Sequence, residues 1–500
     1  MSDNILNSDD LFSNGLPTRP LIGIGKVLVT GASGYIGGRL VPELLARGYK
    51  VRAMVRGEPD VYKNLWPQAE VVVADALKIE DLRRAFEEID VIYYLIHFLY
   101  LGPKEFEAAD IKAAFNVRCA AEESQVKRLI YLGGLGDVRS PLSSHLRSRI
   151  EVAEELKKAK LGVTILRAAV IIGSGSASYE IIQHLVKKLP ILLIPHWAKN
   201  KCQPIAIRDV IKYLVGVLEV PDTLGKSFDI GGRDILTYEE MLRVFVALLH
   251  KKTIFILSPF SHIRFYAYLA SLFTPVPNTI TQCLMEGLKN EVICIDDTIK
   301  KLIPFETISY REAIVRAMSR EEQDRVHTRW SDAYPPAHSL AIKLNEIKGR
   351  PAYMKEYSLI TKKTAESLFK SICRIGGRQG WFENNWLWKL RGMLDRILLG
   401  VGTVRGRKRY YRLEINDVID FWRIEDIKEN RRLLLRAEMR LPGKAWLEFK
   451  IDDLGDGRRT LSVVAYYGTH SLSGKIYWYI CLPFHHFIFR KLIEAIEKRS

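Results

Sequence analysis

The 500-residue sequence has no close pair of cysteines and no apolar run long enough to cross a bilayer. Its six cysteines occur singly, and no histidine cluster has metal-ligand spacing, so we expect reduced thiols and no metal site. A membrane-spanning helix needs about 20 apolar residues. The longest apolar run, residues 476–489, is interrupted by Pro483. The first residues also lack the cationic start and apolar core of a signal peptide, so we expect a cytoplasmic protein.

Positive charge is abundant but unevenly placed. The formal net charge is +17, and residues 351–500 hold 29 Lys and Arg against 17 Asp and Glu, which leaves +5 for residues 1–350. The same final segment holds six of the nine tryptophans. A nearly balanced first part and a basic, aromatic second part predict two domains and an anionic partner for the second.

Short β-branched runs alternate with amphipathic stretches from Lys26 onward, which predicts βαβ units around a parallel sheet. Right-handed crossovers would make this a doubly wound α/β sheet. We expect a flexible tail over 1–24, this domain with a substrate lobe over 25–320, a linker over 321–349 and a second domain over 350–500. The expected strands of the first domain are residues 26–31, 50–56, 69–75, 90–97, 127–134 and 162–173.

The pattern changes after about Gly349. One strand over 352–360 and one helix over 364–372 precede several strand-like runs, and a helix over 484–499 ends the chain. Pro-Gly and Gly-Asp-Gly turns separate the strand-like runs. This part predicts an α+β domain in which an antiparallel sheet wraps a helix.

Three glycines lie between the first predicted strand and the helix predicted over residues 35–47. Gly31 permits a tight turn, Gly34 lets the backbone approach a diphosphate, and Gly37 allows close packing of helix and sheet. The helix start would then present free N–H groups to the phosphates. We therefore predict a dinucleotide site, the alternative being a plain strand-to-helix turn.

Arg56 ends the second predicted strand, where an NAD-selective site would place a carboxylate. A guanidinium suits the 2′-phosphate of NADP, because its donors match phosphate geometry. Glu58 and Asp60 lie close in sequence, so NAD remains possible, and a solvated arginine at a strand end is the simpler alternative. NADP(H) is the predicted cofactor.

These features resemble the extended and atypical branch of the short-chain dehydrogenase/reductase family, and the NmrA-like members most closely. The resemblance rests on TGASGYIG, covers about residues 26–320 and implies an NAD(P)-binding Rossmann domain. It places Ser33, Tyr35 and Ile36 at the cofactor together with the three glycines.

The resemblance also assigns the ends of two later strands. Asp75, with Ala76 beside it, maps to the residue that meets the adenine, and Ile96-His97 maps to the border of the nicotinamide ribose. Asp75 would serve equally well as a helix N-cap. His97 has the alternative of a satisfied core histidine.

The family's catalytic pattern is not kept. Active members use Tyr-x-x-x-Lys, and by spacing His145 stands at the Tyr position and Arg149 at the Lys position. Gly133–Gly134 replaces the usual serine. A histidine can still exchange a proton near neutral pH, so His145 and Arg149 are the candidate catalytic residues. The alternative is a polar helix start, capped by Ser143 or Ser144, with no chemical role.

The second part resembles a C-terminal domain of unknown function that follows such dehydrogenase domains in bacterial proteins. The resemblance rests on GRQGWFENNWLWKLRG, DVIDFWRIED, LRAEMRLPGKAWLEF and YWYICLPFHHFIF. It suggests a helix-grip fold of the START type that encloses an apolar ligand, whereas its tryptophans fit a plain aromatic core equally well.

A basic run, GTVRGRKRYYR over residues 402–412, would suit nucleic acid or acidic lipid, but a solvated loop explains it more simply. We expect no nucleic-acid partner. Peripheral contact with an anionic membrane through the basic second domain stays open.

The sequence thus predicts an NADP-dependent oxidoreductase with a hydrophobic carbonyl, enone, isoprenoid- or quinone-like substrate. Loss of the Tyr-Lys pair leaves one rival, a non-catalytic NADP(H) sensor or an assembly or scaffold protein.

Overall fold

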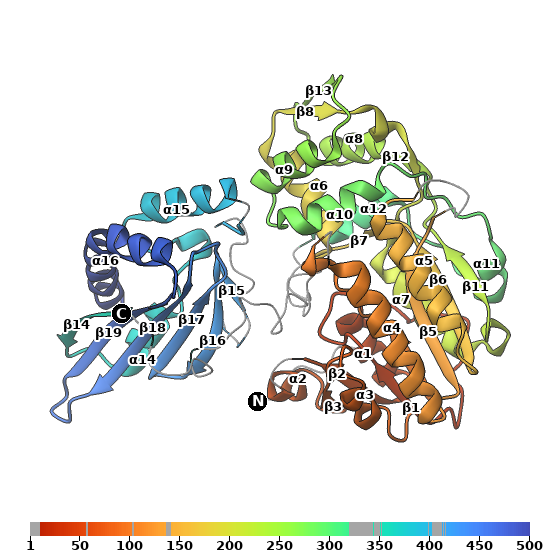
Figure 1. Ribbon diagram of the computed structural model, residues 1–500, viewed down its shortest axis with the longest axis horizontal. Helices are drawn as coiled ribbons and strands as arrows, with labels where there is room; N and C mark the ends of the chain where they lie inside the picture. The colour runs from red at the N-terminus through yellow and green to blue at the C-terminus, as the bar shows by residue number, and fades with distance from the viewer. Residues whose placement is uncertain are drawn as a thin grey trace. The chain divides into compact units, whose positions relative to one another are not determined.

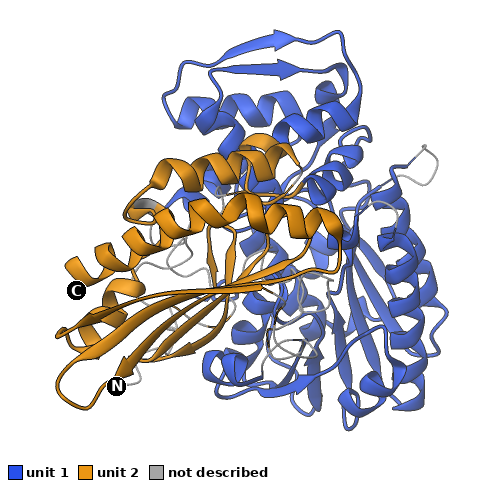
Figure 2. Ribbon diagram, turned by 60° about the vertical axis from the view of Figure 1, so that its left-hand side comes forward, with its two compact units in different colours: residues 1–270, 278–335 blue, residues 271–277, 336–500 orange. Residues whose placement is uncertain are grey.

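The computed structural model describes residues 11–56, 59–102, 105–136, 142–319, 344, 351, 353–398, 400–402, 413, 415 and 417–500. The chain forms two compact units, one of residues 1–270 and 278–335 and the other of residues 271–277 and 336–500 (Figure 2). The predicted linker, apart from Leu344, and nearly all of the basic run at 402–412 lie outside the described residues. Their structure therefore stays a prediction.

A seven-stranded parallel sheet organises the first unit, in the order β3-β2-β1-β4-β5-β6-β11 (Figure 1). The order steps outward from β1 in both directions, which is the doubly wound arrangement that the sequence predicts. Its strands are β1 (Lys26–Val29), β2 (Lys50–Val55), β3 (Glu70–Val73), β4 (Val91–Tyr94), β5 (Arg128–Gly134), β6 (Gly162–Ala168) and β11 (Ser227–Ile230).

Helices cover both faces of this sheet. On one face α1 (Gly37–Ala46) packs beside α7 (Ile207–Glu219), and their apolar stripes share one buried core with the strands. On the other face α4 (Phe106–Glu123) lies between α3 (Ile79–Ala85) and α5 (Ser144–Lys157). Two shorter helices, α2 (Pro59–Leu65) and the 3-10 turn η2 (Leu99–Leu101), follow β2 and β4. The parallel Rossmann-type sheet is thereby confirmed.

The remainder of the first unit is built from short strands and further helices. The run predicted as one strand over 162–173 is divided at residues 169–170 into β6 and β7 (Ile171–Ile172), because β7 pairs with β10 (Ile205–Ala206) in a separate sheet. The other strands are β8 (Ile191–Ile194), β9 (Lys201–Cys202), β12 (Leu236–Thr237) and β13 (Ile254–Leu257). The helices are α6 (Ala177–Lys188), η3 (His196–Lys199), η4 (Pro221–Thr223), α8 (Tyr238–Leu248), α9 (Ile263–Phe273), α10 (Asn278–Gly287), α11 (Thr298–Leu302) and α12 (Tyr310–Met318).

The described part of the expected N-terminal tail is attached to the first unit. The Glu43 carboxylate on α1 accepts hydrogen bonds from the backbone N–H groups of Phe12 (2.7 Å) and Ser13 (2.9 Å) and from the Ser13 hydroxyl. Farther along, Thr18 donates to Glu219 of α7. From residue 11 onward, these contacts fix the segment that we expected to be flexible.

The second unit holds a six-stranded antiparallel sheet in the order β14-β19-β18-β17-β16-β15. The strands are β14 (Tyr353–Thr361), β15 (Val418–Ile419), β16 (Trp422–Lys428), β17 (Arg432–Ala437), β18 (Lys444–Asp453) and β19 (Arg459–Gly468). The helices are α14 (Ala365–Ile372), η7 (Gly377–Gln379), α15 (Asn385–Ile397) and α16 (Leu472–Lys498). The mostly antiparallel sheet agrees with the sequence pattern, whereas α15 and residues 472–483 of α16 were not predicted as helix.

Aromatic side chains fill the core of the second unit. Of its six tryptophans five are buried, and the rings of Trp381 and Trp388 stack with centroids 4.3 Å apart. Phe489 and Ile493 of α16 pack into the same core. Trp386, by contrast, is 62% exposed on α15. No helix in the described ranges is both long and apolar enough to span a bilayer.

Candidate functional site

The glycine turn connects β1 to α1 at the carboxyl edge of the sheet. Gly31 has φ +65°, and a Cβ atom there would lie 3.0 Å from the carbonyl oxygen of Leu95. A Cβ atom on Gly37 would lie only 2.4 Å from the carbonyl oxygen of Gly31, and the Gly34 N–H donates to that same oxygen at 2.9 Å. The turn therefore requires glycine at two positions for steric reasons, and it leaves the start of α1 open to a ligand.

A cavity of about 250 Å³ lies over this turn. Nine of the ten predicted cofactor residues line it, namely Gly31, Ser33, Gly34, Tyr35, Ile36, Gly37, Arg56, Ala76 and His97. Much of the remaining lining is apolar and comes from Leu95, Ile96, Phe98, Leu99 and Ile280. The fold thus collects residues from the ends of β1, β2, β3 and β4 in one space, as expected at a topological switch point.

Arg56 follows the last residue of β2 and lines the cavity. Its Nη1 donates to the Tyr100 hydroxyl at 2.7 Å, and its guanidinium lies 5.8 Å from the ring centroid of Phe98. The tyrosine hydroxyl and the ring thus hold the guanidinium at the cavity rather than leaving it in solvent.

Asp75 is the one predicted cofactor residue outside the cavity lining. Its carboxylate accepts a hydrogen bond from the Leu77 N–H at 3.0 Å and so closes the turn before α3. Ala74 and Ala76 on either side line the cavity, and Asn116 donates to the Ala76 carbonyl at 2.9 Å. In this structure Asp75 stabilises the turn, close to its alternative role as a cap.

His97 is joined to a buried carboxylate. Its Nδ1 lies 3.1 Å from Oδ2 of Asp110 on α4. Because a carboxylate only accepts, Nδ1 carries the proton and Nε2 presents a lone pair. That Nε2 is buried and has no hydrogen-bond partner among the described residues, although the residue lines the cavity. Burial, reinforced by the charge of Arg149, lowers the pKa of His97, so the ring is neutral at pH 7.

Asp110 gathers four donors around one carboxylate. Arg149 Nη2 donates at 2.5 Å and the Ser148 hydroxyl at 3.1 Å, and the Phe98 N–H donates to the other oxygen at 3.0 Å. Burial alone would raise the pKa of Asp110, but His97 and Arg149 outweigh it and hold that pKa well below the ordinary value. A fully buried, ionised carboxylate therefore orients His97.

Arg149 reaches Asp110 across the end of β5. A Cβ atom on Gly134 would lie 3.2 Å from Cγ of Arg149, so the glycine leaves room for the arginine side chain. This gives a steric reason for glycine where the family has serine. The Arg149 guanidinium is bound to Asp110 and is not among the residues that line the cavity.

His145 stacks on His97 one turn before Arg149. The ring centroids are 5.1 Å apart, and the buried Nδ1 of His145 has no hydrogen-bond partner among the described residues. Burial, followed by the charges of His97 and Arg149, lowers the pKa of His145 to about 3. The ring is therefore neutral at physiological pH and lies outside the cavity lining.

Sequence reasoning missed Asp110 and Tyr100. The signal for Asp110 was present, because it lies one helical turn after Phe106 and one before Ala113 and Ala114, on the face of α4 that is otherwise apolar and buried. A carboxylate on such a face needs a partner. Tyr100 carries no comparable signal, since it lies in the short turn η2.

The segment that contains the glycine turn resembles a known protein family. Residues 31–188 match the model of a family described as NAD(P)H-binding. The first unit carries an NAD(P)H-binding domain. The match supports the expected resemblance to NmrA-like reductases and epimerases, and it starts at the glycine turn.

The NAD(P)H-binding domain has distant curated relatives. The chain is 25% identical over 240 residues to a protein of Arabidopsis thaliana, NADH dehydrogenase (ubiquinone) 1 alpha subcomplex subunit 9, mitochondrial. The match covers 46% of this chain and 60% of the relative. It is 23% identical over 225 residues to the chloroplastic divinyl chlorophyllide a 8-vinyl-reductase of the same plant, covering 41% and 53%. The chain thus spans less than two thirds of these relatives.

One solved structure similar to the NAD(P)H-binding domain is the triphenylmethane reductase of Citrobacter sp. complexed with NADP(H). It has a TM-score of 0.49 and 19% identity, and the match covers 59% of this chain and all of that one. The second unit matches a family described as a protein of unknown function, over residues 347–492. Its START-like helix-grip fold is therefore not established by comparison.

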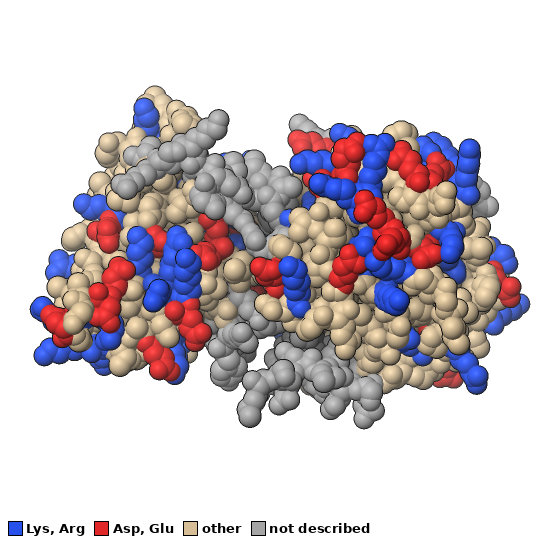
Figure 3. Space-filling model, turned by 90° about the horizontal axis from the view of Figure 1, so that it is seen from below, with Lys and Arg blue, Asp and Glu red and all other residues tan. Residues whose placement is uncertain are grey.

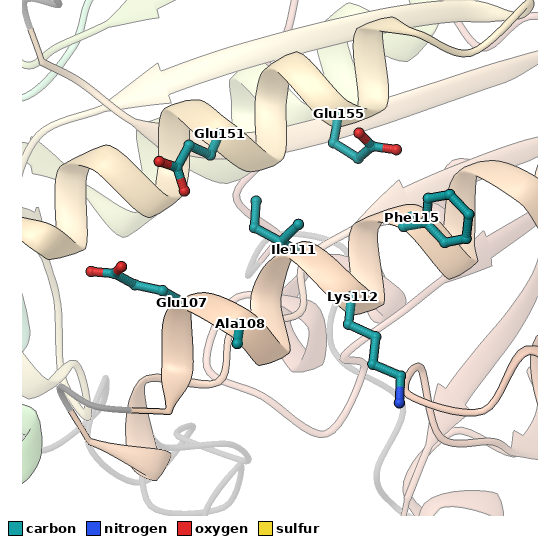
Figure 4. Close-up of a pocket in the computed structure, with 7 residues that line it drawn as sticks. All are labelled: Glu107, Ala108, Ile111, Lys112, Phe115, Glu151 and Glu155. Carbon is teal, nitrogen blue, oxygen red and sulfur yellow. The ribbon is translucent and has the colours of Figure 1, made fainter.

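A second hollow of about 530 Å³ lies outside the NAD(P)H-binding cavity, between α4 and α5 (Figure 4). Three carboxylates, one apolar ring and Lys112 surround it, and Figure 4 shows Glu151 and Glu155 on one helix and Glu107 on the other. Glu107 is paired with Arg147 at 3.3 Å and Glu155 with Arg118 at 2.9 Å. Two of the carboxylates are thus already paired with arginines, so this hollow offers no argument for a catalytic site. Within the described residues no His, Cys, Asp and Glu cluster could hold a metal ion.

Proposed function

We propose that the protein is an NADP(H)-dependent oxidoreductase that acts on a hydrophobic carbonyl, enone, isoprenoid- or quinone-like substrate. One observation carries the proposal: the glycine turn, Arg56 and His97 line a single cavity, and the buried Nε2 of His97 has no hydrogen-bond partner among the described residues. In the order given, these groups would bind a diphosphate, bind a 2′-phosphate and transfer a proton.

The chain's own residues fit the dinucleotide. A Cβ atom at Gly31 or Gly37 would meet backbone atoms of the protein itself, so glycine keeps this turn tight, and the start of α1 presents N–H groups beside it. Arg56, at the end of β2, is placed for a 2′-phosphate. When bound, the reduced cofactor would supply a hydride, that is, two electrons and one proton, to the substrate carbon.

The matching proton is assigned to His97. Reduction of a carbonyl or an enone also needs one proton, and the reverse oxidation releases one. The neutral ring held by Asp110 has its Nε2 lone pair available to accept a proton from a hydroxyl group and, by microscopic reversibility, to return it. In this proposal His97 replaces the missing tyrosine, while Arg149 positions it through Asp110.

The lining supports the proposed substrate class. Leu95, Ile96, Phe98 and Leu99 follow β4, and Ile280 comes from α10, so the cavity presents apolar surface beside His97. One curated relative is named as a reductase of a vinyl group on a chlorophyllide, which is a large conjugated molecule. An apolar conjugated carbonyl or enone agrees with both observations.

Two measurements test the proposal. Titration calorimetry of the intact protein should detect NADPH binding, with NADH binding more weakly. A panel of hydrophobic ketones, enones and quinones should then be screened for NADPH oxidation. If NADPH binds but none of these compounds oxidises it, the result would count heavily against an enzyme. If no nicotinamide nucleotide gives a heat of binding, both the proposed cofactor binding and the proposed reaction would be refuted.

A second candidate function is a non-catalytic NADP(H)-binding sensor or assembly protein. It is favoured by the pKa of about 3 at His145 and by the engagement of Arg149 with Asp110, because neither side chain can act as the family's Tyr-Lys pair does. The relative named as a subunit of NADH dehydrogenase is compatible with such a role. If the protein is a sensor, the His97→Ala variant should bind NADPH as tightly as the unchanged protein, and neither of the two should oxidise it.

For the second unit we propose a helix-grip module that holds an apolar ligand. The proposal is supported by the element order, in which a strand, two helices, five strands and a long helix follow one another, and by pairing of the first strand with the last. Native mass spectrometry of the intact protein tests it: a co-purified lipid-like ligand is expected. A ligand-free spectrum together with no uptake of lipid would favour a plain aromatic core.

We propose no nucleic-acid partner. On the face drawn in Figure 3, Lys and Arg side chains are interspersed with Asp and Glu. Such mixing lowers the local positive potential that phosphate binding needs. Retention of the intact protein on a DNA or RNA column at physiological salt would contradict this.

A further inference from the structure

Two short strands form a ribbon at one end of the first unit. β8 and β13 pair in parallel, with Ile191 opposite Ile254 and Leu193 opposite Ile256, and they form a sheet of their own (Figures 1 and 2). Alternation along the strands sends Leu192, Ile194 and Phe255 inward, where they join the core that contains Phe245 of α8. One face of the ribbon is therefore covered by its own chain.

The opposite face is apolar and exposed. Ile191 is 44% exposed, Leu193 41%, Ile254 62% and Ile256 45%. Phe260 and Phe265, shortly after β13, are also exposed. Both strands, ILLI and IFIL, read as unbroken apolar runs, a composition found in strands covered on both faces. A ribbon with one solvated face would normally alternate apolar and polar residues, so this face is built to be covered.

Within the sequence of the two strands and their flanks, charge is of one sign. Residues 181–208 and 241–285, which contain the two strands and their flanks, include no Asp or Glu. Two carboxylates lie just outside these stretches: Glu180 interacts with Lys187, and Glu239 pairs with Arg243, whose guanidinium lies over the Phe255 ring. Because the strands are parallel, the basic pairs Lys187–Lys188 and Lys251–Lys252 precede them at the same end of the ribbon. Lys187, Lys188 and Lys252 are exposed, whereas Lys251 donates to the carbonyls of Val186 and Leu189 at 2.7 Å and 3.0 Å.

We propose that this ribbon face, formed by Ile191, Leu193, Ile254 and Ile256, docks on an anionic lipid bilayer. Aliphatic side chains would enter the boundary between headgroups and acyl chains, while the neighbouring lysines meet lipid phosphates. The lack of any carboxylate in both stretches favours an anionic surface over a protein face of mixed charge. The surface belongs to the first unit, not to the basic second domain for which the sequence left membrane contact open, and the inference is independent of nucleotide binding.

Co-sedimentation of the full chain with vesicles tests the proposal. We expect binding at low salt to vesicles of phosphatidylcholine with phosphatidylglycerol, and much less binding to pure phosphatidylcholine or at high salt. The double substitution Ile254→Ser with Ile256→Ser should weaken binding about tenfold or more, because it removes two aliphatic side chains from the contact. Lys187→Gln and Lys252→Gln should each weaken it about fivefold.

Ile360→Ser is the matched control, since Ile360 is a strand isoleucine of the second unit and is 62% exposed. It should sediment as the unchanged protein does, and thermal melts should show every variant folded. The proposal is overturned if the unchanged protein stays in solution with phosphatidylglycerol vesicles at low salt, or if the Ile254/Ile256 variant binds them equally well. A homodimer that dissociates in the same double variant would assign the face to a second copy and would also overturn it.

Discussion

His97 and His145 stack with their ring centroids 5.1 Å apart and their planes inclined by 24°, yet only His97 has a carboxylate on its ring. Asp110 fixes the tautomer of His97 and leaves its buried Nε2 as a hydrogen-bond acceptor, in a residue that lines the cavity. His145 has a pKa of about 3 and no such partner. The two histidines are therefore chemically unequal, and we propose the proton-exchange role for His97, where spacing had suggested His145.

This inequality predicts different outcomes for two substitutions. If a reducible substrate is found, His97→Ala should lower kcat by about 10²–10⁴, the usual contribution of a general acid or base. His145→Phe should retain most activity, because a phenyl ring can replace the stacked imidazole. Steady-state kinetics under saturating NADPH would measure both. If His145→Phe lost far more activity than His97→Ala, the catalytic role would belong to His145 instead.

The low pKa of His145 predicts acid sensitivity of the fold. The unfolded chain binds a proton at this residue below about pH 6.5, whereas the folded protein does not until about pH 3. Stability is therefore complete above the unfolded pKa and falls across this window as the pH drops, by up to about 1.4 kcal/mol per pH unit from this residue. His145→Phe should remove that share of the slope. Urea unfolding from pH 7 to pH 4 measures it, and identical slopes for the two proteins would contradict the assignment.

Arg56 should set the preference between the two nicotinamide cofactors. Arg56→Ala removes a charged donor from the predicted 2′-phosphate position, so NADPH affinity should fall about tenfold or more while NADH affinity stays within a few-fold. Tyr100→Phe, which removes only the hydroxyl that Arg56 contacts at 2.7 Å, should have a smaller effect. Calorimetric titration of each variant with both nucleotides is the measurement. Equal losses for NADPH and NADH would show that Arg56 does not read the extra phosphate.

Gly37 should tolerate no side chain. In Gly37→Ala the new methyl group would meet the Gly31 carbonyl oxygen at 2.4 Å, so α1 must shift away from the turn and NADPH binding should be lost. Gly48→Ala is the control. Gly48 has φ +85° with open space around it, so alanine there should cost about 1 kcal/mol of stability and leave NADPH affinity unchanged. Melting temperature and calorimetry together separate the two effects.

The glycine turn and the parallel sheet were predictable because their signals are local. Gly31 and Gly37 lie within one strand-turn-helix unit, and six of the seven strands of the parallel sheet fall within predicted runs, whereas β11 was not predicted. Arg56 could be singled out for the same reason, since it directly follows its strand, and it lines the cavity.

The polar network was not predictable in the same way. His97, Asp110 and Arg149 come from three elements separated by more than a dozen residues each, so only folding brings them into contact. Spacing alone therefore pointed to His145, which occupies the family position but lacks the carboxylate. In the second unit, α15 was missed because Trp386 and Leu390, which are exposed, blur its apolar face.

The attachment of Phe12 and Ser13 to Glu43 bears on how the protein can be shortened. A version that began at Lys26, the start of the first strand, would remove three donors from a carboxylate that is only 4% exposed, whose pKa burial already raises. The amino-terminal segment thus holds in place the helix that begins at the dinucleotide site. Removing this segment would loosen α1 even though none of the removed residues lines the cavity.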